Sequence, residues 1–318
     1  MKNRFLLLGA MALVGVLGVG LASCGGSDGD AIKLYSREHG SGTRECFFEG
    51  IGYGDVKKDD KWNEGVVVSS ASSNGAIMTS VGDDENGLGY CSLDSIDTVK
   101  SIKGLTFEGV AASEETVVDG TYKLQRNFNF VAADSSLLDA QHALAKDAFV
   151  AFMTESKEGL QAIAAEGGIL TKSVASAKSW SEIVTTTSKF QNLNIKGVTI
   201  NACGSTSVEN VLGGLASAFK EATGCTVTPN QTGSGDAVPG ITGEKTTQYE
   251  IGFLSRELEA DEKDSLTEAN AKGSICKDAV VPIVNAANTA VTNSTAEALA
   301  AAYKGEITTW SEFAELVA

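Results

Sequence analysis

A turn rich in glycine and hydroxyl groups recurs at three places in this chain, each time ahead of an expected helix. The first copy is Tyr35-Ser36-Arg37-Glu38-His39-Gly40-Ser41-Gly42-Thr43-Arg44, before a helix expected over 45–51. The second, 204–209, follows an alternating apolar run over 193–200, and the third, 232–236, follows a short apparent strand over 225–229. Strands that lead through short turns into helices are the units of α/β folds.

These turns also have the groups needed to bind an oxyanion. The start of a helix offers free backbone N–H groups and the positive end of the helix dipole, and glycines let a ligand approach the backbone. Ser41 and Thr43 add hydroxyl donors, and Arg37 supplies a planar cation that is always charged. A simpler alternative is a set of well-capped helices, since Thr206 and Glu209 have the spacing of a capping box.

Several segments of the chain match motifs of one known family. The strongest are Ser-Arg-Glu-His-Gly-Ser-Gly-Thr-Arg at 36–44, Gly-Ser-Thr-Ser-Val at 204–208, Gly-Ser-Gly at 233–235 and Ile-Gly-Phe-Leu-Ser-Arg-Glu-Leu at 251–258. Together with segments at 74–76, 88–93, 119–126, 284–285 and 304–310, they resemble the phosphate-binding proteins of bacterial phosphate ABC transporters. The resemblance implies an α/β fold of the type II periplasmic-binding-protein class, a clamp of two lobes joined by crossover strands.

The order of these segments differs from the order expected in that family, where the Gly-Ser-Thr segment comes first. The chain therefore resembles a circular permutant that is cut in the connection between Trp310 and Tyr35. The Ser/Thr/Lys-rich segment 169–192 is expected to be the linker that joins the family's C-terminal and N-terminal parts. As an alternative, the two halves pair between chains in a domain swap.

The resemblance also implies where the ligand binds. One lobe would be split between 32–115 and 285–318, and the other would run continuously over 116–284 with hinge segments. The ligand would bridge both lobes, and the expected binding residues are Arg37, Ser41, Gly42, Thr43, Ser205, Thr206, Ser207 and Ser234.

A carboxylate is expected at this site as well. The family has an aspartate just before the Ile-Gly element, and this chain has Glu250 there, one methylene longer. A buried carboxylate accepts a hydrogen bond from the proton of hydrogen phosphate and repels sulfate, which has no proton to donate. The resemblance thus implies phosphate selectivity through Glu250.

The function implied by the resemblance is capture of phosphate outside the cytoplasm and delivery to an ABC permease, by a monomer without a cofactor. One alternative is a binding or sensor lipoprotein for another oxyanion. A phosphatase or esterase is a further alternative, but the chain has no Gly-x-Ser-x-Gly elbow and only two histidines, His39 and His142. No carboxylate cluster suggests a pair of metal ions, so the chain is not expected to be an enzyme.

The N-terminus resembles a lipoprotein signal. Residues 1–23 contain Lys2 and Arg4 ahead of an apolar run over 5–17. Leu21-Ala22-Ser23-Cys24 resembles a lipobox, so Cys24 is expected to be lipidated and to anchor the chain to the cell membrane, with 24–31 as a flexible tether. The alternative, a transmembrane anchor, requires a longer apolar run.

The composition narrows the choice of partners. The chain has 318 residues and a formal net charge of −16 at pH 7, which argues against nucleic acid and anionic lipid surfaces. Its 42% hydrophobic and 21% charged residues suit two compact lobes. Among its 6 cysteines, Cys203 and Cys225 are the first candidates for a disulfide, with buried free thiols as the alternative.

Overall fold

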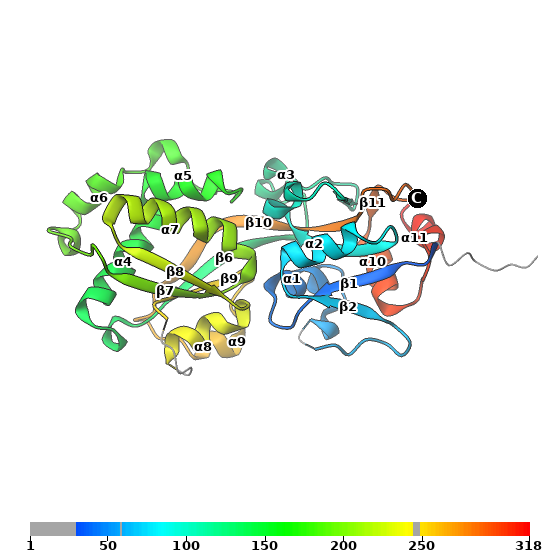
Figure 1. Cartoon of the computed structure of the whole chain (residues 1–318), viewed down its shortest axis with the longest axis horizontal. Coiled ribbons are helices and arrows are strands. Elements are labelled where there is room, and N and C mark those ends of the chain that lie inside the picture. Colours follow the sequence, from blue (N-terminus) through cyan, green and yellow to red (C-terminus); the bar gives the residue numbers. More distant parts are fainter. Residues whose placement is uncertain (1–29, 58, 244–248) are drawn as a thin grey trace, which may run out of the picture.

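The computed structural model describes residues 30–57, 59–243 and 249–318. The expected signal segment, Cys24 and most of the expected tether lie outside these residues. Two α/β lobes lie side by side along the long axis, and the strands β6 (Gln125–Ala132) and β10 (Lys272–Asn285) run through both (Figure 1). The expected α/β fold with two lobes and crossover strands is confirmed.

One continuous sheet connects the lobes. In the described residues it has nine strands, in the order β2-β1-β3-β10-β6-β9-β7-β8, with β4 paired to β10 beside this path. The bounds of the remaining strands are β1 Lys33–Arg37, β2 Val68–Ala71, β3 Gly87–Ser92, β4 Ile102–Gly104, β7 Thr199–Gly204, β8 Thr226–Gln231 and β9 Ile251–Leu254. In each lobe a central strand, β1 or β7, pairs in parallel with two neighbours, whereas β6 and β10 are antiparallel to each other. The order is therefore symmetrical about the two crossover strands.

The split lobe packs around a cluster of aromatic rings. Its helices are α1 (Gly42–Gly50), α2 (Asn74–Gly82), α3 (Glu114–Val118), α10 (Ala296–Lys304) and α11 (Trp310–Leu316), and β5 (Thr106–Phe107) pairs with β11 (Asn293–Ser294) at its outer end. Phe47 stacks on Tyr90 with the ring centroids 4.0 Å apart, and Phe48 meets Tyr303 edge to face. These contacts fasten α1 to β3 and α10, which fixes the position of the first glycine-rich turn.

The continuous lobe has its own core. Its helices are α4 (Ala140–Glu155), α5 (Lys157–Ala165), α6 (Trp180–Thr186), α7 (Glu209–Thr223), α8 (Ala237–Thr242) and α9 (Ala260–Asp264). Short 3₁₀ helices in the two lobes are Gly54–Val56, Leu93–Thr98, Ser135–Leu137, Val174–Ser176, Ser188–Phe190, Thr206–Val208 and Ser234–Asp236. Along α7 the buried face consists of Val211, Leu212, Leu215 and Phe219, the spacing of an amphipathic helix. The helix ends at Gly224, whose φ of 74° is left-handed and suits glycine.

The two cores meet inside the crossover strands. Leu124, just before β6, packs in the split-lobe core and Phe128 of β6 packs in the other; along β10 the change falls between Cys276 and Ala279. The change from one core to the other therefore falls within β10 and at the start of β6.

The segment 169–192, expected to be a linker, is folded into the continuous lobe. It contains α6, and Trp180 at its start is 6% exposed and contacts the rings of Phe152, Phe190 and Phe219. The segment can still join the two parts of the chain, but its aromatic residues also form part of the core of the continuous lobe.

The two ends of the described chain lie next to each other. Ala31 forms a bridge with Thr309, and Ser311 Oγ donates to Asp30 Oδ2 at 2.7 Å. A circular permutation cut between Trp310 and Tyr35 requires this proximity.

The cysteine pair considered first does not form. All five cysteines in the described residues are free thiols. Cys203 is paired in register with Asn230, five residues beyond Cys225, so the two cysteines are about 16 Å apart at ~3.3 Å per residue. A disulfide needs α-carbons within about 7 Å, so the pairing is excluded.

Over the part of the chain that the structure describes, every helix is too short or too polar to span a membrane.

Candidate anion-binding site

The starts of four helical segments meet between the two lobes. In the split lobe, β1 leads into α1 and β2 leads into α2; in the continuous lobe, β7 and β8 lead into the 3₁₀ turns that begin at Thr206 and Ser234. The carboxyl ends of parallel strands lie at one edge of a sheet, and here the two edges face each other. The lobes are in direct contact at this point, since Arg37 and Thr43 bond to residues of the other lobe.

Arg37 is the central cation of this cluster. It is 0% exposed, and its Nη1 donates to Asn74 Oδ1 at 2.8 Å. Its Nη2 donates across the lobe boundary to Thr206 Oγ1 at 2.6 Å. Glu38 accepts from Nε and from Nη2, both at 2.8 Å. The guanidinium is therefore paired with one carboxylate and held toward the opposite lobe.

Hydroxyl groups from both lobes complete the cluster. Thr43 Oγ1 lies 2.5 Å from Ser207 Oγ, and Ser205 Oγ donates to Ser255 Oγ at 2.7 Å. The backbone N–H of Ser255 donates to Ser234 Oγ at 3.1 Å. All of these residues are buried, so the cluster is a set of polar groups shielded from water.

Gly42 and Ser41 set the approach of α1. A Cβ at Gly42 would collide with Ser255 Oγ and come within 2.6 Å of Ser234 Oγ, so only glycine fits where the lobes touch. Ser41 caps α1 by accepting from Arg44 N at 3.4 Å. The structure thus brings together Arg37, Gly42, Thr43, Ser205, Thr206, Ser207 and Ser234, with Ser41 at the adjoining helix start.

Glu250 is the exception, because the structure places it away from this cluster. The residue precedes β9, and its Oε2 accepts from Asn201 N at 2.6 Å. The cluster lies at the carboxyl ends of β7 and β9, whose pairing runs from Ala202–Ile251 to Gly204–Phe253. Glu250 is therefore at the opposite end of the strand, about four residues or roughly 13 Å from the cluster.

Sequence reasoning missed several buried polar residues beside the cluster. Asn74 and Arg126 lie in segments that carried the family resemblance, so their positions gave a signal. Asp278 was expected to be at most a minor acceptor, and it lies opposite Arg126 in the pairing of β6 with β10. Its Oδ2 accepts from Arg126 Nε at 2.9 Å and from Nη2 at 2.7 Å.

Asp94 adds a second carboxyl group near Asp278. Burial and then the charge of Asp278 raise the pKa of Asp94 to about 7. Its Oδ1 accepts from Ser95 Oγ at 2.8 Å, and its buried Oδ2 has no hydrogen-bond partner among the described residues. The split lobe therefore contains a carboxyl group that titrates near neutral pH.

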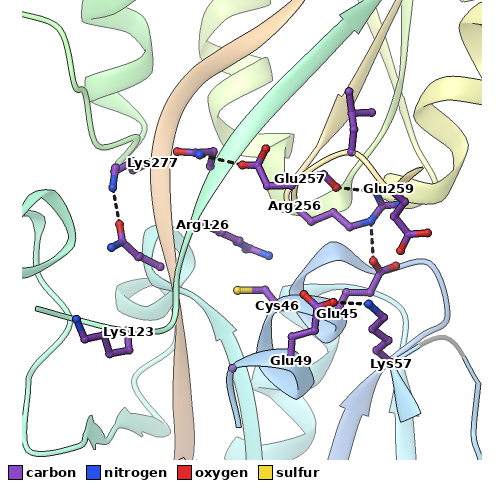
Figure 2. Close-up of a pocket in the computed structure, with 14 residues that line it drawn as sticks. Glu45, Cys46, Glu49, Lys57, Lys123, Arg126, Arg256, Glu257, Glu259 and Lys277 are labelled. Carbon is purple, nitrogen blue, oxygen red and sulfur yellow. Dashed lines mark hydrogen bonds and ion pairs between the residues drawn. The ribbon is translucent and has the colours of Figure 1, made fainter. Parts of the chain in front are cut away.

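Two clefts adjoin the cluster. The larger, of about 690 Å³, lies between α1, β6 and the loop after β9, and it is lined by acidic and basic side chains from both lobes (Figure 2). The smaller, of about 300 Å³, lies between the starts of α2 and α7 and includes Asn74, Thr206 and Ser207. Both clefts follow the boundary between the lobes.

Two α/β lobes joined by crossover strands, with capped helix starts facing each other across the boundary, define the class of periplasmic-type solute-binding proteins. The profile of the PBP superfamily domain matches residues 176–317. The phosphate-binding protein PstS 2 of Streptococcus pneumoniae serotype 4 is 34% identical over 320 residues, which cover 97% of this chain and 99% of that protein. The chain therefore belongs to the PstS family of phosphate-binding proteins.

Two further comparisons agree. PstS 2 of Streptococcus agalactiae serotype V is 28% identical over 318 residues, covering 97% of this chain and 98% of that protein. The crystal structure of the phosphate-binding protein of a phosphate ABC transporter from S. pneumoniae matches with a TM-score of 0.63 and 31% identity, covering 89% of this chain and 99% of that one. Because the sequence alignments run through both chains almost end to end, these relatives share the order of segments found here. A permutation relative to other members of the family stays a prediction.

Proposed function

We propose that this protein binds inorganic phosphate, as hydrogen phosphate, between its two lobes and delivers it to an ABC permease. The observation that carries the proposal is the buried Arg37, which reaches across the lobe boundary to Thr206 amid helix starts from both lobes. The names of the relatives, phosphate-binding proteins, support the same ligand.

The proposed binding residues are donors on both sides of the boundary. From the split lobe they are Arg37, Gly42 and Thr43, with Ser41 holding the start of α1; from the continuous lobe they are Ser205, Thr206, Ser207 and Ser234. Backbone N–H groups and hydroxyls bind oxyanion oxygens directly, and Arg37 adds a full charge. Since the donors come from two lobes, the ligand contacts are complete only when the lobes are closed.

The remaining proposals concern the setting of the protein. We expect a monomer that performs no chemistry on its ligand. It would act outside the cytoplasm, anchored to the cell membrane by a lipid on Cys24. Substituting Cys24 by serine should release the chain from the membrane fraction, and continued retention would argue for a different anchor.

The position of Glu250 favours one alternative function. With that carboxylate about 13 Å away, the cluster consists mainly of donors, which suit a fully deprotonated oxyanion such as sulfate as well. The carboxylates beside the cluster, Glu38 and Asp278, are each bonded to an arginine. The preference between phosphate and sulfate therefore decides between the two functions.

Calorimetric titration of the anion-stripped full-length chain in mild detergent tests the proposal. One-to-one binding of phosphate, with sulfate at least about a hundred-fold weaker, would support phosphate transport; that ratio corresponds to roughly 2.7 kcal/mol. Preference for sulfate would support the alternative. Hydrolysis of p-nitrophenyl phosphate by the same preparation, abolished by Ser234→Ala, would show a phosphatase activity and contradict both.

A further inference from the structure

A second buried arginine, Arg126 of β6, lies beside the proposed phosphate site. Its side chain and that of its cross-strand partner Asp278 are each 3% exposed. Its Nη2 also donates to Ser92 Oγ, and this hydroxyl donates to Asp278 Oδ2 at 2.8 Å. The guanidinium is therefore fixed by β10 and β3, and Asp278 neutralises its charge.

The remaining nitrogen of Arg126 points to the binding loops of both lobes. Its Nη1 donates to Thr43 Oγ1 at 3.0 Å and, more weakly, to the backbone oxygen of Ser255 at 3.4 Å. Thr43 belongs to α1 of the split lobe, whereas Ser255 follows β9 of the continuous lobe and bonds to Ser205 and Ser234. Figure 2 shows Arg126 in the cleft between the lobes, with Cys46 of α1 nearby.

The bond from Arg126 determines how the Thr43 hydroxyl is oriented. A guanidinium has only donors, so Thr43 Oγ1 must be the acceptor in this contact. A hydroxyl has a single proton, so the proton of Thr43 is directed away from Arg126 and is available to another acceptor. Ser207 Oγ lies 2.5 Å from Thr43 Oγ1, and either hydroxyl can be the donor in that contact. A phosphate oxygen bound between Thr43 and Ser207 would receive that proton as a hydrogen bond.

We propose that Arg126, held by Asp278 and Ser92, is a positioning residue that orients Thr43 as a donor to the bound oxyanion. This inference rests on the proposed function. Because Asp278 neutralises the guanidinium, Arg126 acts through Thr43 and makes no direct charge contact with the ligand. Its effect on affinity therefore depends on the hydroxyl of Thr43.

A double-mutant cycle on the full-length chain in detergent, read by calorimetry with inorganic phosphate, tests this dependence. One arm is Arg126→Gln combined with Asp278→Asn, which removes both charges and leaves no unpaired buried ion. The other arm is Thr43→Val, which removes only the hydroxyl. Each arm should weaken phosphate binding by about ten- to a hundred-fold, the effect of one hydrogen bond to a charged ligand. All changes together should weaken it little more than the larger arm does.

Losses that multiply in the combined variant would overturn the proposal, because independent groups add in free energy. Arg126→Lys keeps the charge but lacks the planar fork, so it should not restore affinity; affinity equal to the parent would also overturn it. Arg126→Lys also serves as the second variant if the chain with Arg126→Gln and Asp278→Asn does not fold. Lys123→Gln removes an exposed cation of the same cleft that has no bond to Thr43, and should change affinity by less than about two-fold. Failure of the unaltered chain to bind phosphate would refute the proposed function itself, and this inference with it.

Discussion

Glu45→Gln is expected to weaken ligand binding by loosening the contact between the lobes. Glu45 lies on α1, and Arg256 follows β9 in the other lobe; Glu45 Oε2 and Arg256 Nε are 2.7 Å apart (Figure 2). The two side chains are 5% and 10% exposed. Arg256 is also bonded to both oxygens of Glu262 in its own lobe, at 2.6 and 2.8 Å. When the lobes separate, Arg256 keeps one carboxylate and Glu45 regains water.

The size of the effect follows from these contacts. Exposed ion pairs contribute about 0–1 kcal/mol, and close pairs buried at an interface couple by about 1.5–7 kcal/mol. The Glu45–Arg256 contact is buried, but Glu262 shares the charge of Arg256, and Arg256 Nε makes no hydrogen bond among the described residues. We therefore expect about 1–2 kcal/mol. In a protein that is mostly open without ligand, this raises the apparent Kd by about 5- to 30-fold.

Calorimetry with phosphate gives the Kd, and small-angle X-ray scattering of the same samples gives the radius of gyration with and without ligand. Glu49→Gln is the matched control, because Glu49 is on the same helix and pairs with Lys57 of its own lobe. An unchanged Kd together with an unchanged radius of gyration in Glu45→Gln would refute the reasoning, as would an equal effect of Glu49→Gln.

Three other substitutions test the site, its pH dependence and the core. Arg37→Ala should weaken phosphate binding by about 2–5 kcal/mol, measured by calorimetry, because a buried charge contact is lost; unchanged affinity would remove Arg37 from the site. Burial and the charge of Asp278 raise the pKa of Asp94 to about 7. Between about pH 4 and 7 the folded chain therefore holds a proton on Asp94 that the unfolded chain releases, so the free energy of unfolding falls as the pH rises. Asp94→Asn removes that fall, so its gain in Tm should be larger at pH 8 than at pH 5, and equal gains would contradict the assignment. Trp180→Ala should cost about 3–5 kcal/mol in denaturant unfolding, whereas a loss below about 1 kcal/mol would mean that 169–192 is only a linker.

Local signals in the sequence predicted most of the helix starts at the site. The capping box expected from Thr206 and Glu209 does not form, since Ser205 caps the 3₁₀ turn and α7 follows Val208 without a side-chain cap. Ser41 and Ser205 each accept a hydrogen bond from a nearby backbone N–H, as hydroxyl residues at helix starts do. The apolar spacing of α7 is equally local, and it correctly predicted the buried face of that helix. Because these signals concern residues a few positions apart, neither the order of segments nor the rest of the fold affects them.

The positions of Glu250, Arg126 and Asp278 depend on long-range pairing. Glu250 was placed by its neighbours in sequence, but its distance from the site depends on where β9 begins relative to β7. Arg126 and Asp278 are 152 residues apart in the chain, and only the pairing of β6 with β10 brings them together.

The segment 169–192 contains a local signal for a helix start that the sequence analysis did not use. Ser179 and Glu182 form a capping box, as Thr309 and Glu312 do at the start of α11. That spacing predicts a helix start just where the segment was expected to be a linker.

The bridge between Ala31 and Thr309 places both ends of the described chain at the outer end of the split lobe, away from the cleft (Figure 1). Anything fused to either end would therefore be carried by one lobe and leave the other free of attachment. A fluorescent reporter inserted into the continuous lobe and a second one fused at the C-terminus would report the distance between the lobes directly. Because both ends are on one lobe, the chain could be attached to a surface through its ends while the other lobe moves, as an oxyanion biosensor requires.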